Sequence, residues 1–296
     1  MGCFFMINKI KGMIYIVLII LLLPYVATTL INGNFSTFND LQNQSDEEAI
    51  LIGMLAKEVS IDTSIEALKA QAVIARTNYY YFKENNLEER IEYMDLNEME
   101  QIWGEGRFLD CYEYLGKVIK DTDNEVITYN NKIIIAPFHP ISGGRTRNGN
   151  EIYNSTEFSY LVDKESKEDL MAEGYIKIDY FDKEYFKNII KLEVEDSKIL
   201  DNISIVKRDC AGYVLEIKMG EKTVTGEEFK KLFGLNSECF YIDEYNGQIR
   251  IMTKGVGDGL GLSLYGANQM ALSGKGYKEI IEYYYSGINI VKHKNE

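Results

Sequence analysis

The sequence has few of the residues that usually build metal, redox or nucleic-acid sites. Its 296 residues include 3 prolines, 2 histidines and 4 cysteines, and no two cysteines are closely spaced. Neither a zinc knuckle nor a dithiol redox motif is indicated, and we expect no metal or other cofactor. Basic residues are also outnumbered, with 32 Lys and Arg against 46 Asp and Glu and a formal net charge of -14. So acidic a chain has no general field to attract nucleic acid, and no nucleic-acid partner is expected.

What the chain does contain is enough apolar material for a substantial core. Hydrophobic residues make up 46% and charged residues 26%, which argues against intrinsic disorder. The 22 tyrosines are unusually many. A tyrosine ring is apolar with a hydrogen-bonding tip, which suits carbohydrate grooves and the edges of a core alike. The cysteines that follow residue 45 (Cys111, Cys210 and Cys239) are predicted to be reduced, buried thiols.

An uncharged run near the amino terminus predicts a membrane anchor. Residues 13–31 read MIYIVLIILLLPYVATTLI, and about 19 residues at about 1.5 Å each span about 28 Å, close to the thickness of a bilayer core. Lys9 and Lys11 precede the run, and no further Lys or Arg occurs before Lys57. This asymmetry predicts a cytoplasmic tip (1–12), a transmembrane helix (13–31), a juxtamembrane linker (32–44) and an extracytoplasmic domain (45–296).

The alternative for the same run is a cleaved signal peptide. The apolar run is long for the core of a signal peptide, and no small-x-small cleavage site is obvious after residues 25–27. We therefore favour an uncleaved, single-pass anchor in the cell membrane.

The domain that follows mixes helix and strand signals without regular alternation. Helices are predicted over 45–58 and 63–85, each beginning at a capping-box pattern, Ser45-x-x-Glu48 and Thr63-x-x-Glu66. Residues 163–200 are predicted to be mainly helical, with 183–196 the clearest piece. Further helices are predicted over 226–235, 267–273 and 277–287. Strands are predicted over 117–122, 125–130, 132–138, 203–209, 213–219 and 222–226, with a hairpin around Asn246-Gly247. The fold class is therefore α+β, with mixed helices and antiparallel strands.

Three segments rich in glycine or small residues are candidates for a site, because such turns let the backbone approach a ligand closely. They read EVSIDTSIEALKAQAVIARTNYYY from residue 58, FHPISGGRT from 138, and GVGDGLGLSLYGANQMALSGKGYKEII from 255. GVGDGLG is only loosely similar to a dinucleotide-binding fingerprint and lacks the helix that should follow it. No phosphate-binding P-loop is present.

Together these segments resemble the stage II sporulation protein D family and its relatives among the amidase enhancers. The order of the motifs also matches, and the similarity extends from about residue 49 to about residue 290. The resemblance implies a lytic transglycosylase that cuts peptidoglycan glycan strands stripped of their stem peptides, during engulfment of the forespore. It also implies a wall amidase as a partner, which removes the stem peptides.

The resemblance further implies that Glu58 is the catalytic acid. Cleavage of a glycosidic bond needs a proton on the leaving oxygen. The muramic C6 hydroxyl can then attack C1, so one carboxyl serves as acid and afterwards as base. Such an acid must stay protonated near neutral pH, which predicts that Glu58 is partly buried against apolar groups. Read without the resemblance, Glu58 merely ends a helix.

A larger set of residues is expected to bind the substrate. Arg76, the family's arginine within the helix, could hold the lactyl carboxylate or orient Glu58, although a structural salt bridge with Asp62 or Glu66 is an equal alternative. The other candidates come from the same helix and from the two glycine-rich loops: Lys69, Gln71, Ser142, Gly143, Gly144, Thr146, Asp258, Ser263 and Tyr265.

The chain departs from the family's late motif, G-H-G-V-G-M-S-Q-Y-G-A, at several positions. Asp258 stands for the histidine, Leu262 for the methionine and Leu264 for the glutamine. If Asp258 faced Glu58, its charge would raise the pKa of that acid. The usual proline after the catalytic glutamate is absent. Some relatives bind zinc near the S-G-G loop, but this chain has only His139 there, and we predict no zinc site.

Two other classes of function remain as alternatives. A non-catalytic amidase enhancer or glycan-binding module would hold the strand without cutting it, and the altered late motif favours this alternative. A purely structural link between membrane and wall would make Glu58 dispensable.

Overall fold

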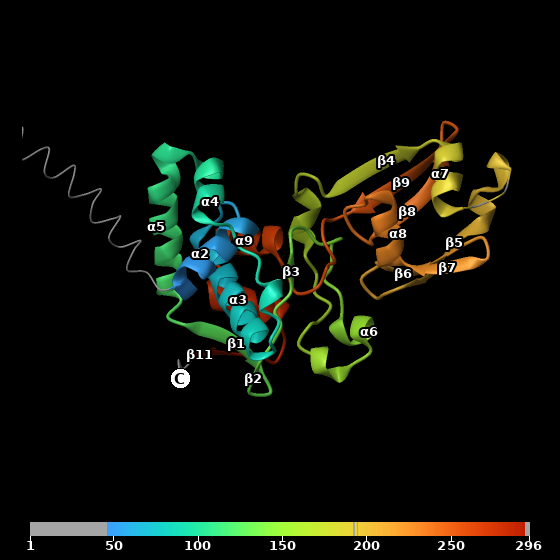
Figure 1. The fold of residues 1–296 in the computed structure, drawn as a ribbon. Helices are drawn as coiled ribbons and strands as arrows, with labels where there is room; N and C mark the ends of the chain where they lie inside the picture. Colours follow the sequence, from blue (N-terminus) through green and yellow to red (C-terminus); the bar gives the residue numbers. More distant parts are fainter. Residues whose placement is uncertain (1–45, 192, 194, 294–296) are drawn as a thin grey trace, which may run out of the picture.

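The computed structural model describes residues 46–191, 193 and 195–293. These residues form two lobes (Figure 1), a mainly helical lobe and a second lobe built from residues 176–254. The chain enters the second lobe after the loop that follows strand β3 (Phe138–His139) and returns at residue 255, where the late glycine-rich segment begins. The helical lobe therefore combines residues from both ends of the described chain.

The centre of the helical lobe is helix α3, which is buried along most of its length. Its alanines Ala70, Ala72 and Ala75 are fully buried, and such small side chains let neighbouring helices approach closely. Helices α2 and α5, which pack on each other, contact α3, and so do α9 and α10, which also pack on each other. The helices of this lobe are α2 (Asp46–Glu58), α3 (Ile65–Glu84), α4 (Leu96–Trp103), α5 (Glu105–Asp121), α6 (Gly149–Tyr153), α9 (Leu264–Leu272) and α10 (Tyr277–Tyr284).

Two small sheets complete the helical lobe. One has the order β11-β1-β2 and is antiparallel, and the other is the parallel pair β10-β3. That pair joins the F-H of the early loop to the L-S of the late motif, which brings two of the glycine-rich segments together. The strands are β1 (Glu125–Tyr129), β2 (Lys132–Ile133), β3 (Phe138–His139), β10 (Leu262–Ser263) and β11 (Asn289–Lys292).

The second lobe consists of two antiparallel sheets, of order β4-β9-β8 and β5-β6-β7, around its own core. Phe186, Phe229 and Phe240 lie in this core with no exposed surface. The predicted hairpin is confirmed, with Asn246 and Gly247 at positive φ between β8 and β9. The elements are β4 (Ile176–Phe181), α7 (Lys183–Ile190), β5 (Ile203–Arg208), β6 (Val214–Met219), β7 (Lys222–Thr225), α8 (Gly226–Phe233), β8 (Phe240–Tyr245) and β9 (Gln248–Lys254).

Short 3-10 helices fill several of the connections in both lobes. They are η1 (Glu88–Arg90), η2 (Thr156–Phe158), η3 (Lys167–Met171), η4 (Asp196–Lys198) and η5 (Leu200–Asn202). Of these, η3 matters most for the site, because it packs against helix α9 of the late motif.

The mixed α+β class with antiparallel sheets is confirmed. The predicted transmembrane segment, 13–31, lies outside the described residues. Within the part of the chain that the structure describes, no helix is both long and apolar enough to cross a bilayer.

Several local predictions are wrong. Residues 117–121 form the end of α5, with Thr122 as its C-cap, instead of a strand, because Leu115, Val118 and Ile119 are buried at helical spacing. The supposedly helical stretch 163–200 contains strand β4. The capping box predicted at Thr63 does not form, since the helix is preceded by Ser64, whose side chain makes no cap hydrogen bond.

The cysteine prediction is correct for two of the three described thiols. Cys111, Cys210 and Cys239 are all free, but Cys210 is exposed while the other two are buried.

Candidate active site

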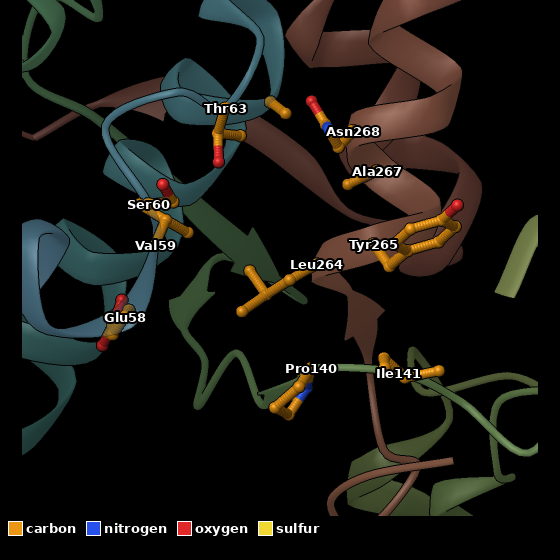
Figure 2. Close-up of a pocket in the computed structure, with 11 residues that line it drawn as sticks. Glu58, Val59, Ser60, Thr63, Pro140, Ile141, Leu264, Tyr265, Ala267 and Asn268 are labelled. Carbon is orange, nitrogen blue, oxygen red and sulfur yellow. The ribbon is translucent and has the colours of Figure 1, made fainter. Parts of the chain in front are cut away.

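A cleft of about 260 Å³ opens where the end of α2, the start of α3, the loop after β3 and the start of α9 meet (Figure 2). Three separate stretches of sequence therefore build one site. The residues that line the cleft are Glu58, Val59, Ser60, Thr63, Ala67, Pro140, Ile141, Leu264, Tyr265, Ala267 and Asn268.

Glu58, the last residue of α2, is the acidic residue of this cleft. Its side chain is half-buried, and one carboxyl oxygen accepts a hydrogen bond of 2.6 Å from Nε2 of Gln71. Burial raises the pKa of Glu58 from 4.5 to about 8, while the hydrogen bond from Gln71 and the charge of Lys57 oppose the rise. The carboxyl is therefore mostly protonated at pH 7, as a general acid requires. The predicted partial burial of Glu58 is confirmed.

Gln71 lies beneath Glu58 rather than on the surface of the cleft. Its side chain has no exposed area and comes from α3, thirteen residues further along the chain than Glu58. Within the described residues, its Oε1 is buried with no hydrogen-bond partner. The structure thus places Gln71 as a support for Glu58, and not in the predicted contact with substrate.

The polar groups of the S-G-G loop are used inside the protein and do not face the cleft. Ser142 is fully buried, and its N–H donates to Asp169. The N–H of Gly143 donates to the hydroxyl of Tyr213, and the N–H of Gly144 to the hydroxyl of Ser142. None of the predicted residues of this loop lines the cleft, whose wall here is the preceding Pro140–Ile141 pair.

The remaining predicted polar residue of the loop, Thr146, is also used internally. Its hydroxyl donates to the carbonyl of Val162 and accepts from the N–H of Lys164. Thr146 is fully buried, so it fastens the loop to a neighbouring segment.

Asp169, in η3, connects the two glycine-rich segments of the site. Its two carboxylate oxygens accept hydrogen bonds of 2.9 Å from the N–H of Ser142 and the hydroxyl of Ser263. The hydroxyl of Ser263 also accepts from the N–H of Gly266 and so caps helix α9. Sequence reasoning missed Asp169, which stands in a charged stretch with no motif around it.

Of the late motif, Tyr265 lines the cleft, and its N–H donates to the carbonyl of Pro140. Ser263 is fully buried and holds α9 instead of facing the cleft. Leu264, which replaces the family's glutamine, also lines the cleft and makes this wall apolar (Figure 2). Asn268, which the sequence did not single out, accepts a hydrogen bond from the N–H of Ser64 and ties α9 to the start of α3.

Arg76 lies in the interior of the helical lobe, with 1% of its surface exposed. Its guanidinium donates to the carbonyls of Ile119 and Glu125 and to the hydroxyl of Thr122, at the end of α5. Arg76 does not line the cleft, and its contacts fasten α5 and β1 to α3. The alternative salt bridges with Asp62 or Glu66 are absent from the ion pairs of the described residues.

Lys69 and Asp258 are also engaged elsewhere. Lys69 pairs with Glu66 at 3.7 Å and with Asp121 at 3.5 Å. Asp258 accepts a hydrogen bond from the N–H of Leu260, two residues away. Neither residue lines the cleft, and Asp258 is not among the groups that act on the pKa of Glu58. Burial, not repulsion by Asp258, accounts for the raised pKa.

His139 in the loop is almost fully buried, with 1% exposed and Nδ1 at 2.9 Å from the carbonyl of Leu260. Burial lowers the pKa of its imidazole. Within the part of the chain that the structure describes, no three His, Cys, Asp or Glu side chains come together as metal ligands.

The fold and the cleft define a class of protein: one with a half-buried carboxyl of raised pKa in an open cleft, assembled from three glycine- or small-residue-rich segments. Comparison with known proteins identifies the family. The family model described as "Stage II sporulation protein" matches residues 37–129. Stage II sporulation protein D of Bacillus subtilis (strain 168) is 31% identical over 270 residues, which cover 84% of this chain and 76% of the relative. This chain belongs to the stage II sporulation protein D family.

Two further relatives bear on this assignment. Stage II sporulation protein D of Bacillus amyloliquefaciens is 28% identical over 256 residues, 82% of this chain and 73% of the relative. The amidase enhancer of Bacillus subtilis (strain 168) is 23% identical over 297 residues, covering 82% of this chain but only 40% of the relative. The predicted kinship with both groups is confirmed.

Proposed function

We propose that this protein is a lytic transglycosylase that cleaves the bonds from N-acetylmuramic acid to N-acetylglucosamine in peptidoglycan strands freed of stem peptides. The observation that carries the proposal is the half-buried Glu58, whose pKa of about 8 keeps it protonated at the mouth of an open cleft. Membership of the sporulation family supports a role in remodelling the wall, and we place that role at engulfment of the forespore.

The proposed reaction needs one carboxyl and no water. Glu58 donates its proton to the glycosidic oxygen as the bond from C1 to that oxygen breaks, and positive charge develops on the muramic ring. The C6 hydroxyl of the same ring then attacks C1, and its proton passes to the carboxylate of Glu58. A 1,6-anhydro end forms, the leaving sugar carries a new hydroxyl, and Glu58 returns to its protonated state.

The surroundings of Glu58 fit both halves of this cycle. Burial favours the neutral acid before cleavage, while the N–H of Gln71 stabilises the carboxylate that exists between the two proton transfers. The apolar wall of Pro140, Ile141 and Leu264 can exclude water from the intermediate, which favours internal attack over hydrolysis.

The alternative function is that of an amidase enhancer or glycan-binding module without catalysis. The replacement of the family's glutamine by Leu264 favours it, because the cleft loses a polar group that could hold the sugar. A wall amidase is then the proposed partner. For either function we propose a single-pass anchor at 13–31, with the amino terminus in the cytoplasm and the cleft outside the membrane.

One experiment separates the two functions. The full chain, in detergent micelles, is incubated with peptide-free glycan strands, and the products are examined by mass spectrometry for 1,6-anhydro ends. Anhydro ends with the wild type and none with Glu58→Gln support the transglycosylase. If both proteins bind the strands and neither cuts them, the enhancer replaces the enzyme.

A further inference from the structure

A second concave pocket lies in the same lobe as the Glu58 cleft, beside the β1–β2 hairpin. Its volume, about 260 Å³, matches that of the cleft. We name it the tyrosine pocket, after three of the residues that line it. Those residues are Tyr81, Tyr129, Asn130, Lys132, Ile133, Ile134, Ile135, Glu157, Phe158 and Tyr160.

The tyrosine pocket combines aromatic faces with unused polar groups. The rings of Tyr129 and Tyr160 have centroids 5.4 Å apart, and those of Phe158 and Tyr160 are 6.3 Å apart. The hydroxyl of Tyr160 donates to the carbonyl of Ile135, but those of Tyr81 and Tyr129 make no hydrogen bond to another described residue. The ammonium of Lys132 likewise has no acidic partner among the ion pairs of the described residues.

Such a lining fits a sugar ring. The C–H faces of a hexosamine are apolar and can stack on aromatic rings, while its hydroxyls and acetamido group need hydrogen-bond partners at the edges. The free hydroxyls of Tyr81 and Tyr129 can supply those partners. Lys132 can pair with the lactyl carboxylate that every muramic residue exposes once its stem peptide has been removed. Glu157 is the acidic residue of the lining and Lys132 the basic one, so the pocket itself is balanced in charge and Lys132 supplies the attraction for a lactyl carboxylate.

The position of the tyrosine pocket relative to the cleft suits a polymer. Helix α3 reaches both sites, with Ala67 in the cleft and Tyr81 in the pocket. Fourteen residues of helix rise about 21 Å and make almost four turns, which places both residues on nearly the same side of α3. The chain from Ile135 to Pro140 also runs from the pocket to the cleft, and five extended steps span about 17 Å. A few linked sugar residues cover such a distance.

We propose that the tyrosine pocket is a distal glycan subsite, which holds an N-acetylated amino sugar of the strand that Glu58 cuts. The proposal rests on the proposed function for the identity of the strand. Two weak sites joined by one polymer raise each other's effective concentration, so long strands bind more tightly than short ones. The tyrosine pocket would thereby select long strands, without touching the reacting bond.

The test measures strand binding without cleavage. The full chain in detergent micelles carries Glu58→Gln, and its dissociation constants are measured for long peptide-free strands and for disaccharide fragments. Adding Tyr81→Ala or Tyr129→Ala should weaken the binding of long strands at least tenfold. The binding of disaccharide fragments, which occupy one site at a time, should change much less. Tyr185→Ala is the matched control, since Tyr185 is 57% exposed on α7 of the other lobe and should have no effect.

Lys132→Glu provides a variant that does not threaten folding, because Lys132 is exposed. It should weaken the binding of long strands severalfold, and the loss should shrink at high salt. Unchanged binding in Lys132→Glu and in the folded tyrosine variants would overturn the subsite. So would a loss of binding seen only with strands that still carry stem peptides, which would make the pocket a peptide site.

The subsite and the proposed function fail in different ways. Anhydro products from the wild type, with no effect of Tyr81→Ala on the Michaelis constant for long strands, would refute the subsite and leave the enzyme. Strand binding that depends on Tyr81, without cleavage by the wild type, would refute the enzyme and leave the subsite.

Discussion

Replacing Glu58 by Gln should stabilise the protein at alkaline pH while it abolishes cleavage. The pKa of Glu58 is 4.5 when unfolded and about 8 in the native cleft. Below pH 4.5 both states hold the proton, so the carboxyl has no effect on stability. Between pH 4.5 and pH 8 the unfolded chain loses the proton and the native protein keeps it, so the wild type loses stability as the pH rises. Above pH 8 the penalty is constant.

The size of the penalty follows from the same two pKa values. Their difference corresponds to about 5 kcal/mol if the native carboxyl were wholly shielded. Water reaches the half-buried carboxyl from the cleft, which screens its charge, so we expect about half of this value, ~2.5 kcal/mol. Glutamine stays neutral and keeps the shape, so it avoids the penalty.

Thermal unfolding of the two proteins at several pH values measures this difference. For a domain of this size, about 1 kcal/mol moves the midpoint by about 2–4 °C, so Glu58→Gln should melt roughly 5–10 °C above the wild type at pH 9. At pH 4 the two midpoints should coincide. A gap between the midpoints that does not change from pH 4 to pH 9 would show that Glu58 titrates normally, and the proposed acid would lose its physical basis.

Three further variants test the contacts around the cleft. Gln71→Met removes the donor that stabilises the Glu58 carboxylate, so the pKa of Glu58 and the alkaline limb of the pH–activity profile should move to higher pH. The kcat should also fall about tenfold or more. An alkaline limb that does not move would contradict the role of this contact. Arg76→Met removes the guanidinium that donates to the carbonyls of Ile119 and Glu125 and to the hydroxyl of Thr122. It should cost about 3 kcal/mol by denaturation, with no change in the Michaelis constant of the protein that remains folded. Asp169→Asn replaces one acceptor oxygen by a donor. It should reduce the stability by about 1–3 kcal/mol, seen as a lower melting temperature, and it should also lower the activity. A normal melting temperature with normal activity would show that Asp169 does not link the two loops.

The helix signals of the sequence predicted the two helices that meet at Glu58, and both helices are confirmed. The pattern around residues 45–85 predicted two helices with a short loop between them, and Glu58 falls where the first helix ends, facing the second. These helices were readable because their apolar residues recur at helical spacing and because a polar loop separates them. Residues 117–122 were misread for a related reason. They are rich in β-branched residues, which favoured a strand. Their apolar residues are nevertheless spaced as in a helix, and the core against which that helix packs is visible only in the structure.

The contacts of individual site residues were decided by tertiary structure. Arg76 and Lys69 share a face of the predicted helix, but only the packing of α5 shows that Arg76 is enclosed and Lys69 is paired at the surface. Asp169 carried no local signal, because its partners Ser142 and Ser263 stand 27 and 94 residues away in the chain. Contacts between residues so distant depend on the whole fold, and no local pattern encodes them.

By itself, the sequence determined the family and the fold class and singled out Glu58 as the candidate acid, since these follow from short motifs and from the spacing of apolar residues. Only the tertiary structure decided that the carboxyl of Glu58 is neutral at pH 7. The pKa of a carboxyl depends on how much water its neighbours exclude, and the neighbours of Glu58 come from three separate segments of the chain.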